Sequence, residues 1–360
     1  MAEREEKILS EAAPGLLDWY AVNARPLPWR RVRSAYHIWI SEIMLQQTRI
    51  EAVIGYYERF FARFPTVRDI AVCDDDSLMK VWEGLGYYSR ARHIKRAAEI
   101  MVEQYDGMLP ETKEALQNLP GIGDYTAAAI ASMAFGEPAA AVDGNVLRVC
   151  SRLLDDPRDV MLPATRKAVT TLLNNIIPAD APGAFNEAMM ELGETICLPS
   201  ATPDCAHCPL RDHCLALERG TVADRPIRNS KVSKKIEKMT VFVLIEEDGS
   251  VAVRQRPADG LLAGLYEFPH VPGHLSASKA KAHLESSYTV KRVERLPDHT
   301  HVFTHKKWLM RGYLAHIQTK KKDGSCRFVP PKKLLSTYPV PTAFAPYRAA
   351  IGEIPAAPCP

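Results

Sequence analysis

Apolar residues recur three and four positions apart over the first half of the chain. This helical spacing holds from residue 7 to about residue 195, for example in the run from Tyr36 to Met44. Turn signals such as Phe64-Pro65-Thr66 and Leu119-Pro120-Gly121 interrupt it. The pattern predicts an all-α domain over residues 7–217.

The pattern changes to that of strands in the last third of the chain. Residues 241–246 and 251–255 predict a hairpin, residues 275–287 a helix, and residues 302–317 a further strand. Residues 218–238 are polar, rich in Lys and Arg, and without a sustained apolar period, so we expect an exposed basic linker. The chain is therefore predicted to be multi-domain, with an α+β domain over residues 239–350.

Composition agrees with two folded domains. The chain has 360 residues, of which 46% are hydrophobic and 25% charged, which excludes disordered, collagenous and disulfide-stapled classes. No apolar run is long enough for a membrane helix, and the first ten residues, MAEREEKILS, are charged where a signal peptide is apolar. We expect a soluble, cytoplasmic protein that does not bind membranes.

Charge is divided unevenly along the chain. Residues 1–220 carry 23 Lys and Arg against 31 Asp and Glu, a net charge of −8, whereas residues 221–360 carry 23 against 12, a net charge of +11. A basic C-terminal third favours a polyanionic partner such as nucleic acid, although charged runs are also common on solvated faces.

Four of the eight cysteines fall within eighteen residues, separated by seven, two and five residues: Cys197, Cys205, Cys208 and Cys214. Four thiolates in a short loop suit tetrahedral zinc or a 4Fe-4S cluster. Structural zinc sites usually contain two pairs of ligands, each pair separated by two to four residues. Only one such pair, Cys205 and Cys208, is present here, which favours iron-sulfur. Four protein ligands leave no open position, so we expect no catalytic metal.

The segment Leu119–Gly123 lies between two predicted helices, 111–118 and 125–135. Two glycines two residues apart allow a tight turn that directs N–H groups towards a phosphate. The alternative is an ordinary helix-to-helix turn. The flanking helices favour a helix-hairpin-helix that clamps the DNA backbone without reading sequence.

Two carboxylates are candidates for glycosidic chemistry. Asp143 precedes a predicted helix, 145–154, where a capping role would satisfy N–H groups and lower its pKa. Glu42 is a lone acid in an apolar helix, where burial would raise its pKa, although it could equally face solvent. Cleavage of a glycosidic bond through an oxocarbenium-like state uses two acids, one with a raised pKa and one with a lowered pKa.

These residues lie in segments that resemble the adenine DNA glycosylase (MutY) family of the endonuclease III superfamily. The resemblance runs from about residue 15 to residue 347 and is carried by LPWRRVRSAYHIWISEIMLQQTRI, LPGIGDYTAAAI, VDGNVLRV, FNEAMMELGETIC and LLAGLYEFP. It implies a hydrolase of base excision repair with a 4Fe-4S cluster, which removes adenine mispaired with 8-oxoguanine or guanine in double-stranded DNA. We expect it to act as a monomer by a retaining-type mechanism.

The resemblance also implies roles for individual residues. Glu42 matches the acid that protonates adenine at N7, and Asp143 the carboxylate that stabilises or bonds the anomeric carbon, oriented by Asn145. Tyr125 matches a further catalytic group. The other matched residues form the base pocket (Arg30, Trp29 and Glu187), the wedge that enters the base stack (Gln47 and Tyr87), the hairpin (Leu119, Gly121 and Gly123) and the lesion-contacting segment (Phe303, Thr304 and His305).

The position of Tyr125 separates activities within the superfamily. Bifunctional members carry a lysine there, whose amine forms the Schiff base that leads to strand cleavage. A phenol cannot form an imine, so the chain is predicted to be monofunctional and to leave an abasic site.

The C-terminal domain resembles the Nudix-like fold with which the family reads 8-oxoguanine. Between residues 269 and 287 the only acid is Glu285, so we expect no magnesium cage and no pyrophosphatase activity. Two features depart from the family: seven residues rather than six separate the first two cysteines, and Thr304 stands where serine is usual.

Two alternatives stay open at this point. The chain could be another superfamily member that acts on thymine mispairs or oxidised pyrimidines, or a non-catalytic sensor of DNA damage.

Overall fold

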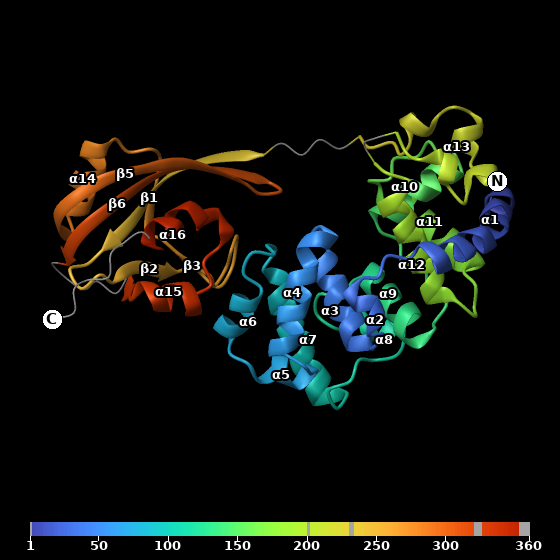
Figure 1. Cartoon of the computed structure of the whole chain (residues 1–360), viewed down its shortest axis with the longest axis horizontal. Coiled ribbons are helices and arrows are strands. Elements are labelled where there is room, and N and C mark those ends of the chain that lie inside the picture. The colour runs from blue at the N-terminus through green and yellow to red at the C-terminus, as the bar shows by residue number, and fades with distance from the viewer. Residues whose placement is uncertain (1, 200–201, 230–233, 320–325, 353–360) are drawn as a thin grey trace. The chain divides into compact units, whose positions relative to one another are not determined.

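The computed structural model of the protein describes residues 2–199, 202–229, 234–319 and 326–352 (Figure 1). It divides into two units. Residues 1–72 and 93–231 form what we call the helical unit, and residues 73–92 and 232–360 form the sheet unit.

The helical unit confirms the all-α expectation for the first part of the chain. Its helices include α1 (Ala2–Asn23), α2 (Pro28–Arg31), α3 (Ala35–Leu45), α4 (Ile50–Arg63), α5 (Val67–Val72), α8 (Lys113–Leu116), α9 (Asp124–Phe135), α10 (Gly144–Leu153), α11 (Pro163–Ile176), α12 (Pro182–Thr195) and α13 (Leu215–Glu218). Helix α7 (Ser89–Gln104) begins in the sheet unit, and three short 3-10 helices follow α12, at Cys205–His207, Arg211–His213 and Val222–Asp224.

Helices α3 and α9 form the centre of this unit because both are apolar on nearly every face. Ser34 caps α3 by accepting a hydrogen bond from the His37 N–H, and every residue from Ile38 to Met44 is buried. Helix α9 is rich in alanine, whose small side chains allow α3 and α12 to pack closely against it. It ends at Gly136, which adopts the left-handed conformation (φ 74°) common after a helix.

Helix α12 holds α9 and α10 together through two glycines. A Cβ on Gly183 would lie 2.9 Å from backbone atoms of Ser132 and Met133 in α9. A Cβ on Gly193 would lie 2.6 Å from the Cβ of Asn145 in α10. Both contacts are closer than a side chain tolerates, so glycine sets the spacing at each crossing.

The sheet unit contains seven strands, in the order β3-β2-β1-β6-β5, with β4 added to β1 and β7 to β2, within the described part of the chain. Strands β1 and β6 are parallel and the other pairs are antiparallel. The elements are α6 (Asp75–Val81), β1 (Lys235–Ile245), β2 (Val251–Gln255), β3 (Tyr266–Glu267), β4 (His270–Pro272), α14 (Ala277–Glu285), β5 (Tyr288–Val302), β6 (Lys306–Thr319), β7 (Arg327–Val329), α15 (Pro331–Thr337), a 3-10 turn (Thr342–Phe344) and α16 (Ala345–Gly352).

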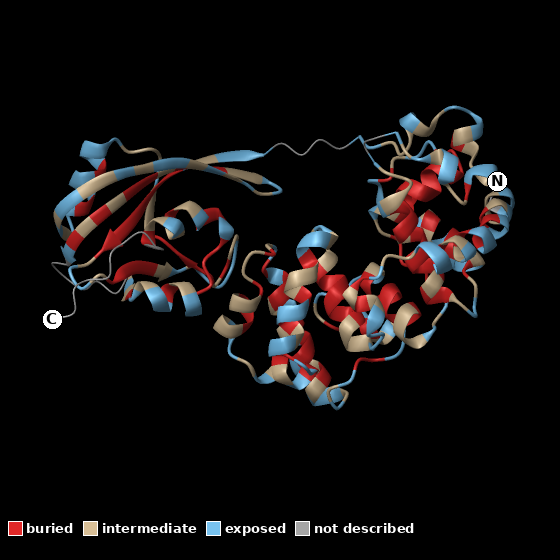
Figure 2. Cartoon of the chain, in the orientation of Figure 1, coloured by how far each residue is buried: buried red, intermediate tan, exposed pale blue. Residues whose placement is uncertain are grey.

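Each face of this sheet has its own apolar core. Alternate residues of β1 point to opposite faces, so Val241 and Val243 pack with Phe344 and Tyr347, whereas Phe242 packs with residues of α14. Buried residues run through β1 in this unit and through α9 and α10 in the helical unit (Figure 2).

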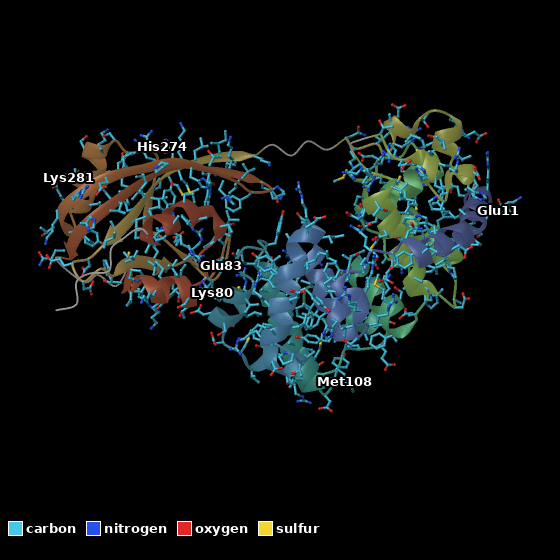
Figure 3. All side chains as sticks on the ribbon, viewed as in Figure 1. Glu11, Lys80, Glu83, Met108, His274 and Lys281 are labelled. Carbon is cyan, nitrogen blue, oxygen red and sulfur yellow. The ribbon has the colours of Figure 1, made fainter. Side chains whose placement is uncertain are left out.

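The division in space differs from the continuous ranges expected from the sequence. Residues 73–92 group with the sheet unit because Lys80 Nζ donates to the Tyr338 carbonyl at 3.3 Å and Glu83 pairs with Arg348 at 2.6 Å; Figure 3 labels Lys80 and Glu83. Part of the expected linker is also ordered, since β1 begins at Lys235, while residues 230–233 lie outside the described part of the chain.

No helix among the described residues has the length and apolar character needed to cross a membrane.

Candidate active site

The helical unit contains an open cavity of about 1230 Å³. Residues of α2, α3, α9 and α12, together with the first turn of α10, line it. Ten of the residues singled out from the sequence share this lining: Trp29, Arg30, Glu42, Gln47, Gly121, Gly123, Tyr125, Asp143, Asn145 and Glu187.

Glu42 is buried at the wall of this cavity, so the solvent-facing alternative is wrong. Its side chain accepts a hydrogen bond of 2.7 Å from the Tyr125 hydroxyl. Burial raises the pKa of Glu42 to about 7, and the nearby charge of Asp143 adds to the rise, whereas the Tyr125 hydrogen bond opposes it. The carboxyl group is therefore half protonated near neutral pH, as a general acid requires.

Tyr125 is held between two groups. Besides the bond to Glu42, its hydroxyl lies 3.1 Å from Met190 Sδ. Burial, followed by the charge of Glu42, raises the pKa of Tyr125 well above its usual value. The phenol therefore stays protonated and can donate a hydrogen bond to the Glu42 carboxylate.

Asp143 caps α10, as the sequence predicts, with Oδ1 accepting from the Val146 N–H at 2.7 Å. The expected direction of its pKa is wrong. Burial raises the pKa of Asp143 and outweighs the hydrogen bonds from Val146 and Asn145, which lower it. The capping position reveals the hydrogen bonds that the carboxylate accepts, but it does not reveal how strongly the folded surroundings desolvate it.

A chain of hydrogen bonds runs from Asp143 to the backbone of Cys197. Asn145 Nδ2 donates to Asp143 Oδ2 at 2.9 Å and to Glu194 Oε1 at 2.7 Å. Arg148 donates to Asn145 Oδ1 at 2.8 Å and to the Cys197 carbonyl at 2.7 Å. Both the Nδ2 and the Oδ1 atoms of Asn145 are thus hydrogen-bonded, which fixes its amide against the Asp143 carboxylate.

Arginines and glutamates form a further part of the cavity lining. Glu187 pairs with Arg30 at 3.7 Å and with Arg33 at 3.0 Å. Glu191, one turn further along α12, pairs with Arg30 at 2.9 Å and with Arg25 at 2.6 Å. Sequence reasoning missed Arg25 and Glu191, although a spacing of four from Glu187 places Glu191 on the same helix face.

The hairpin turn follows α8 and ends at the N-cap of α9. Gly121 has a φ of +79°, and a Cβ there would lie 2.5 Å from the Cβ of His93, so only glycine fits. Gly123 has an ordinary φ of −87°, a Cβ added to it would have no neighbour within 4 Å, and no side chain caps α9 there. Leu119 is buried beneath the turn.

The two residues expected to enter the base stack share an unusual backbone. Gln47 (φ 57°) in the helical unit and Tyr87 (φ 46°) in the sheet unit both adopt the left-handed region. Such strain in residues other than glycine is uncommon and concentrates at functional sites. Tyr87 is 44% exposed despite its large ring.

The segment expected to contact the lesion forms the turn between β5 and β6 in the sheet unit. Phe303 packs edge-on against Trp308, with 4.8 Å between ring centroids. Thr304 Oγ1 lies 2.9 Å from the Tyr87 hydroxyl, and the His305 carbonyl accepts from the Lys235 N–H at 3.0 Å. Thr304 and His305 are exposed at the tip.

The four clustered cysteines line one small cavity of about 30 Å³, which Arg152 and Arg211 also line. Arg152 NH1 donates to Cys197 Sγ at 3.2 Å. Within the described ranges, no three His, Cys, Asp or Glu side chains converge closely enough to hold a single metal ion.

The four cysteines are compatible with a cubane cluster, because each cysteine of a cubane binds a different iron and the four sulfurs need not meet at one point. Burial raises the pKa of Cys208 to about 12, so a strongly electropositive group is needed to hold this sulfur as a thiolate. The donor set therefore fits a 4Fe-4S cluster.

Comparison with known proteins identifies two family regions along the chain. The HhH-GPD superfamily of base excision DNA repair proteins matches residues 40–178, and the NUDIX domain matches residues 240–350. A thermostable thymine-DNA glycosylase of known structure is similar to 60% of this chain and 98% of its own, with 29% identity and a TM-score of 0.54.

Two relatives match over most of the chain. The adenine DNA glycosylase of Arabidopsis thaliana is 35% identical over 81% of this chain and 55% of its own length. That of Mus musculus is 34% identical over 83% of this chain and 69% of its own length. The chain thus spans little more than half of the plant protein. With a helix-hairpin-helix unit, a Nudix-like unit and these relatives, the chain belongs to the adenine DNA glycosylase family.

Proposed function

We propose that the protein is a monofunctional DNA glycosylase that removes adenine mispaired with 8-oxoguanine, or with guanine, by hydrolysis of the N-glycosidic bond. The observation that carries this proposal is that Glu42 and Asp143, 101 positions apart in the chain, line the same cavity with Tyr125 beside Glu42. A cavity of about 1230 Å³ has room for an everted nucleoside.

Glu42 is the general acid. In its protonated form it donates a proton to N7 of the everted adenine, which makes the base a better leaving group. The bond between C1′ and N9 then breaks, and its electron pair leaves with the base. The Tyr125 hydroxyl stabilises the Glu42 carboxylate that remains.

Asp143 stabilises the positive charge that develops on the sugar. Its carboxylate approaches C1′ from the face opposite the departing base, either as an ion pair or in a transient covalent bond, which makes the mechanism of the retaining type. Water then adds to C1′ and gives up its proton to the Glu42 carboxylate. The products are free adenine and an abasic site, and Glu42 is again protonated.

Position 125 does not supply the amine that strand cleavage requires. Where bifunctional members have lysine, Tyr125 provides a phenol that cannot form a Schiff base. Release of adenine without cleavage of the DNA backbone is therefore the expected outcome.

DNA contacts are assigned to both units. The Gly121 turn binds phosphate oxygens through backbone N–H groups, and Gln47 and Tyr87 enter the base stack when the adenine leaves it. The turn that carries Thr304 and His305 contacts 8-oxoguanine, with the Thr304 hydroxyl as hydrogen-bonding group.

We further propose that Cys197, Cys205, Cys208 and Cys214 hold a 4Fe-4S cluster. When bound, the cluster supplies cross-linking of the loop and a redox centre, but no Lewis acid for hydrolysis, because all four irons are occupied by protein ligands. The Arg148 bond to the Cys197 carbonyl joins this loop to Asn145 and so to Asp143.

A single-turnover assay tests the proposed function. A duplex with one adenine opposite 8-oxoguanine is incubated with excess protein, and alkali then converts abasic sites to strand breaks. We expect breaks only after alkali treatment. The same assay with thymine:guanine and oxidised-pyrimidine duplexes distinguishes other superfamily activities, since exclusive release from those duplexes would overturn the proposal.

The Glu42→Gln variant distinguishes an enzyme from a damage sensor. We expect it to lose adenine release by about 100-fold or more while it keeps its affinity for the duplex. A wild-type chain that binds the mispair but releases no base from any of the duplexes would show a sensor instead.

A further inference from the structure

Glu191 is a buried carboxylate that the proposed reaction does not use. It is 1% exposed, lies on α12 and lines the cavity. Both of its oxygens are engaged by Arg25, with Nε to Oε1 at 2.6 Å and NH2 to Oε2 at 2.9 Å. The Arg25 backbone N–H also donates to Oε1, at 3.1 Å.

The same carboxylate holds Arg30. Arg30 NH2 donates to Glu191 Oε2 at 2.9 Å, and Arg30 NH1 donates to the Arg25 carbonyl at 3.0 Å. Burial alone would raise the pKa of Glu191, but the hydrogen bonds from Arg25 and Arg30 outweigh it and hold the pKa below its usual value. Glu191 is therefore charged. It binds the NH2 group of Arg30 directly, and it holds the NH1 group indirectly through Arg25.

Arg30 needs this support because its own helix is short. Helix α2 has four residues, Pro28–Arg31, and leads into extended backbone at Val32. Such a segment takes its position from the groups it contacts rather than from its own hydrogen bonds. Glu191 is the buried anchor to which both Arg25 and Arg30 are tied.

The position of Arg30 matters because of its neighbour. Its Nε lies 3.7 Å from Glu187 Oε1, and both side chains line the cavity. A donor beside an acceptor matches the Watson–Crick edge of adenine, in which N1 accepts and the 6-amino group donates. A 6-oxopurine presents the reverse, with an N1–H donor and an O6 acceptor, and would place donor against donor and acceptor against acceptor.

We propose that Glu191 is a positioning residue that fixes Arg30 beside Glu187 and thereby sets the selectivity of the pocket for adenine over 6-oxopurines. This inference rests on the proposed adenine glycosylase function. It assigns no contact between Glu191 and the base, since both carboxylate oxygens are taken by arginines.

The test compares release of adenine with release of hypoxanthine, which is adenine with the 6-amino group replaced by oxygen. Both are placed opposite 8-oxoguanine in otherwise identical duplexes, and single-turnover rates are measured with the full chain. Sites built on hydrogen bonds reject analogues that cannot form them by up to about 10⁴-fold, so we expect the wild type to prefer adenine by at least about 100-fold.

In Glu191→Gln the amide loses one acceptor and turns a donor towards an arginine. We expect the ratio of adenine to hypoxanthine rates to fall by about tenfold or more, mainly through slower adenine release. The pH profile of the remaining activity should change little, because burial, and not the charge of Arg30, is the main influence on the pKa of Glu42. Glu191→Asp, which keeps the charge on a shorter side chain, should shift the ratio in the same direction and serves if the glutamine variant does not fold.

Asp155→Asn is the matched control. Asp155 is likewise buried and pairs with two arginines, Arg219 at 3.0 Å and Arg225 at 2.9 Å, but it does not line the cavity. We expect this variant to lose stability and to keep the wild-type rate ratio.

The outcomes separate the two claims. If the wild type releases adenine selectively and the Glu191 variants keep its ratio while losing only stability, as Asp155→Asn does, the positioning role is overturned and the proposed function stands. If the wild type releases no adenine, the proposed function is overturned and this inference falls with it.

Discussion

Replacing Glu42 with glutamine should stabilise the folded protein at alkaline pH while abolishing its chemistry. Burial raises the pKa of Glu42 from 4.5 to about 7. Above pH 4.5 the unfolded chain gives up this proton freely, whereas the folded chain keeps it until about pH 7. The folded state therefore loses stability as pH rises between these two values, and the loss is complete above about pH 7.

The size of the effect follows from the shift. Each pKa unit corresponds to about 1.4 kcal/mol, so ionising the buried carboxyl lowers the free energy of unfolding by about 3 kcal/mol. Glutamine cannot ionise and escapes this loss. It also changes the hydrogen bond to Tyr125, whose preference for the ionised carboxylate in the wild type is already contained in the pKa of about 7.

The assay is urea denaturation of the full chain, followed by circular dichroism of the helices, at several pH values from 4 to 9. We expect the free energies of unfolding of the variant and the wild type to differ by a constant amount below about pH 4.5. By about pH 8 the free energy of unfolding of the variant should have risen by about 3 kcal/mol relative to that of the wild type. Glu114→Gln, on an exposed face of α8, controls for the buffer series. A stability difference that stays flat from pH 4 to pH 9 would refute the argument that Glu42 is held in its acid form by burial.

Four other perturbations have outcomes that the same geometry sets. The single-turnover rate of adenine release should fall about tenfold per pH unit above about pH 7, as Glu42 loses its proton; a rate that rises over this range would contradict its role as acid. Gly121→Ala should lower the free energy of unfolding by about 2 kcal/mol, because of its φ of +79° and the contact with His93, whereas Gly123→Ala should have little effect; equal losses in urea denaturation would contradict this. Tyr125→Lys should form a complex with substrate DNA that borohydride traps and the wild type should not, as read on a denaturing gel. Cys208→Ser should lose iron and the brown colour; zinc in the wild-type protein by metal analysis would rule out the iron-sulfur assignment.

Most of the helical unit could be predicted from the sequence because its signals are local. Asp143 stands at a cap position, and the Gly121 turn is flanked by helices on both sides. Strand β5 was not predicted, because none of its residues is buried and register shifts at Val290/Arg292 and Leu296/His299 break its alternation of apolar and polar positions. Its place at the edge of the sheet follows from pairing with β6 and not from its own pattern.

The site was predictable only in part, for a similar reason. Glu42 stands out as an acid in an apolar helix, but that pattern leaves a solvent-facing side chain equally open, and only the structure shows its burial. The pKa direction of Asp143 depends on its burial in the folded chain, which no local pattern shows. The partners of Glu191 are also hidden from local patterns, because they lie far from it in the sequence. Arg25, for example, is separated from Glu191 by 166 positions, and no local pattern joins them.

The close approach of Gly193 to Asn145 determines what a larger residue at position 193 would disturb. A methyl group there would press on Asn145 and Arg148 and move the first turn of α10, with the capping aspartate that begins it. The same crossing belongs to an apolar core that includes Val146 of α10 and Leu192 of α12. A change at residue 193 would therefore disturb the packing and the carboxylate together, and a measurement of one would report on the other.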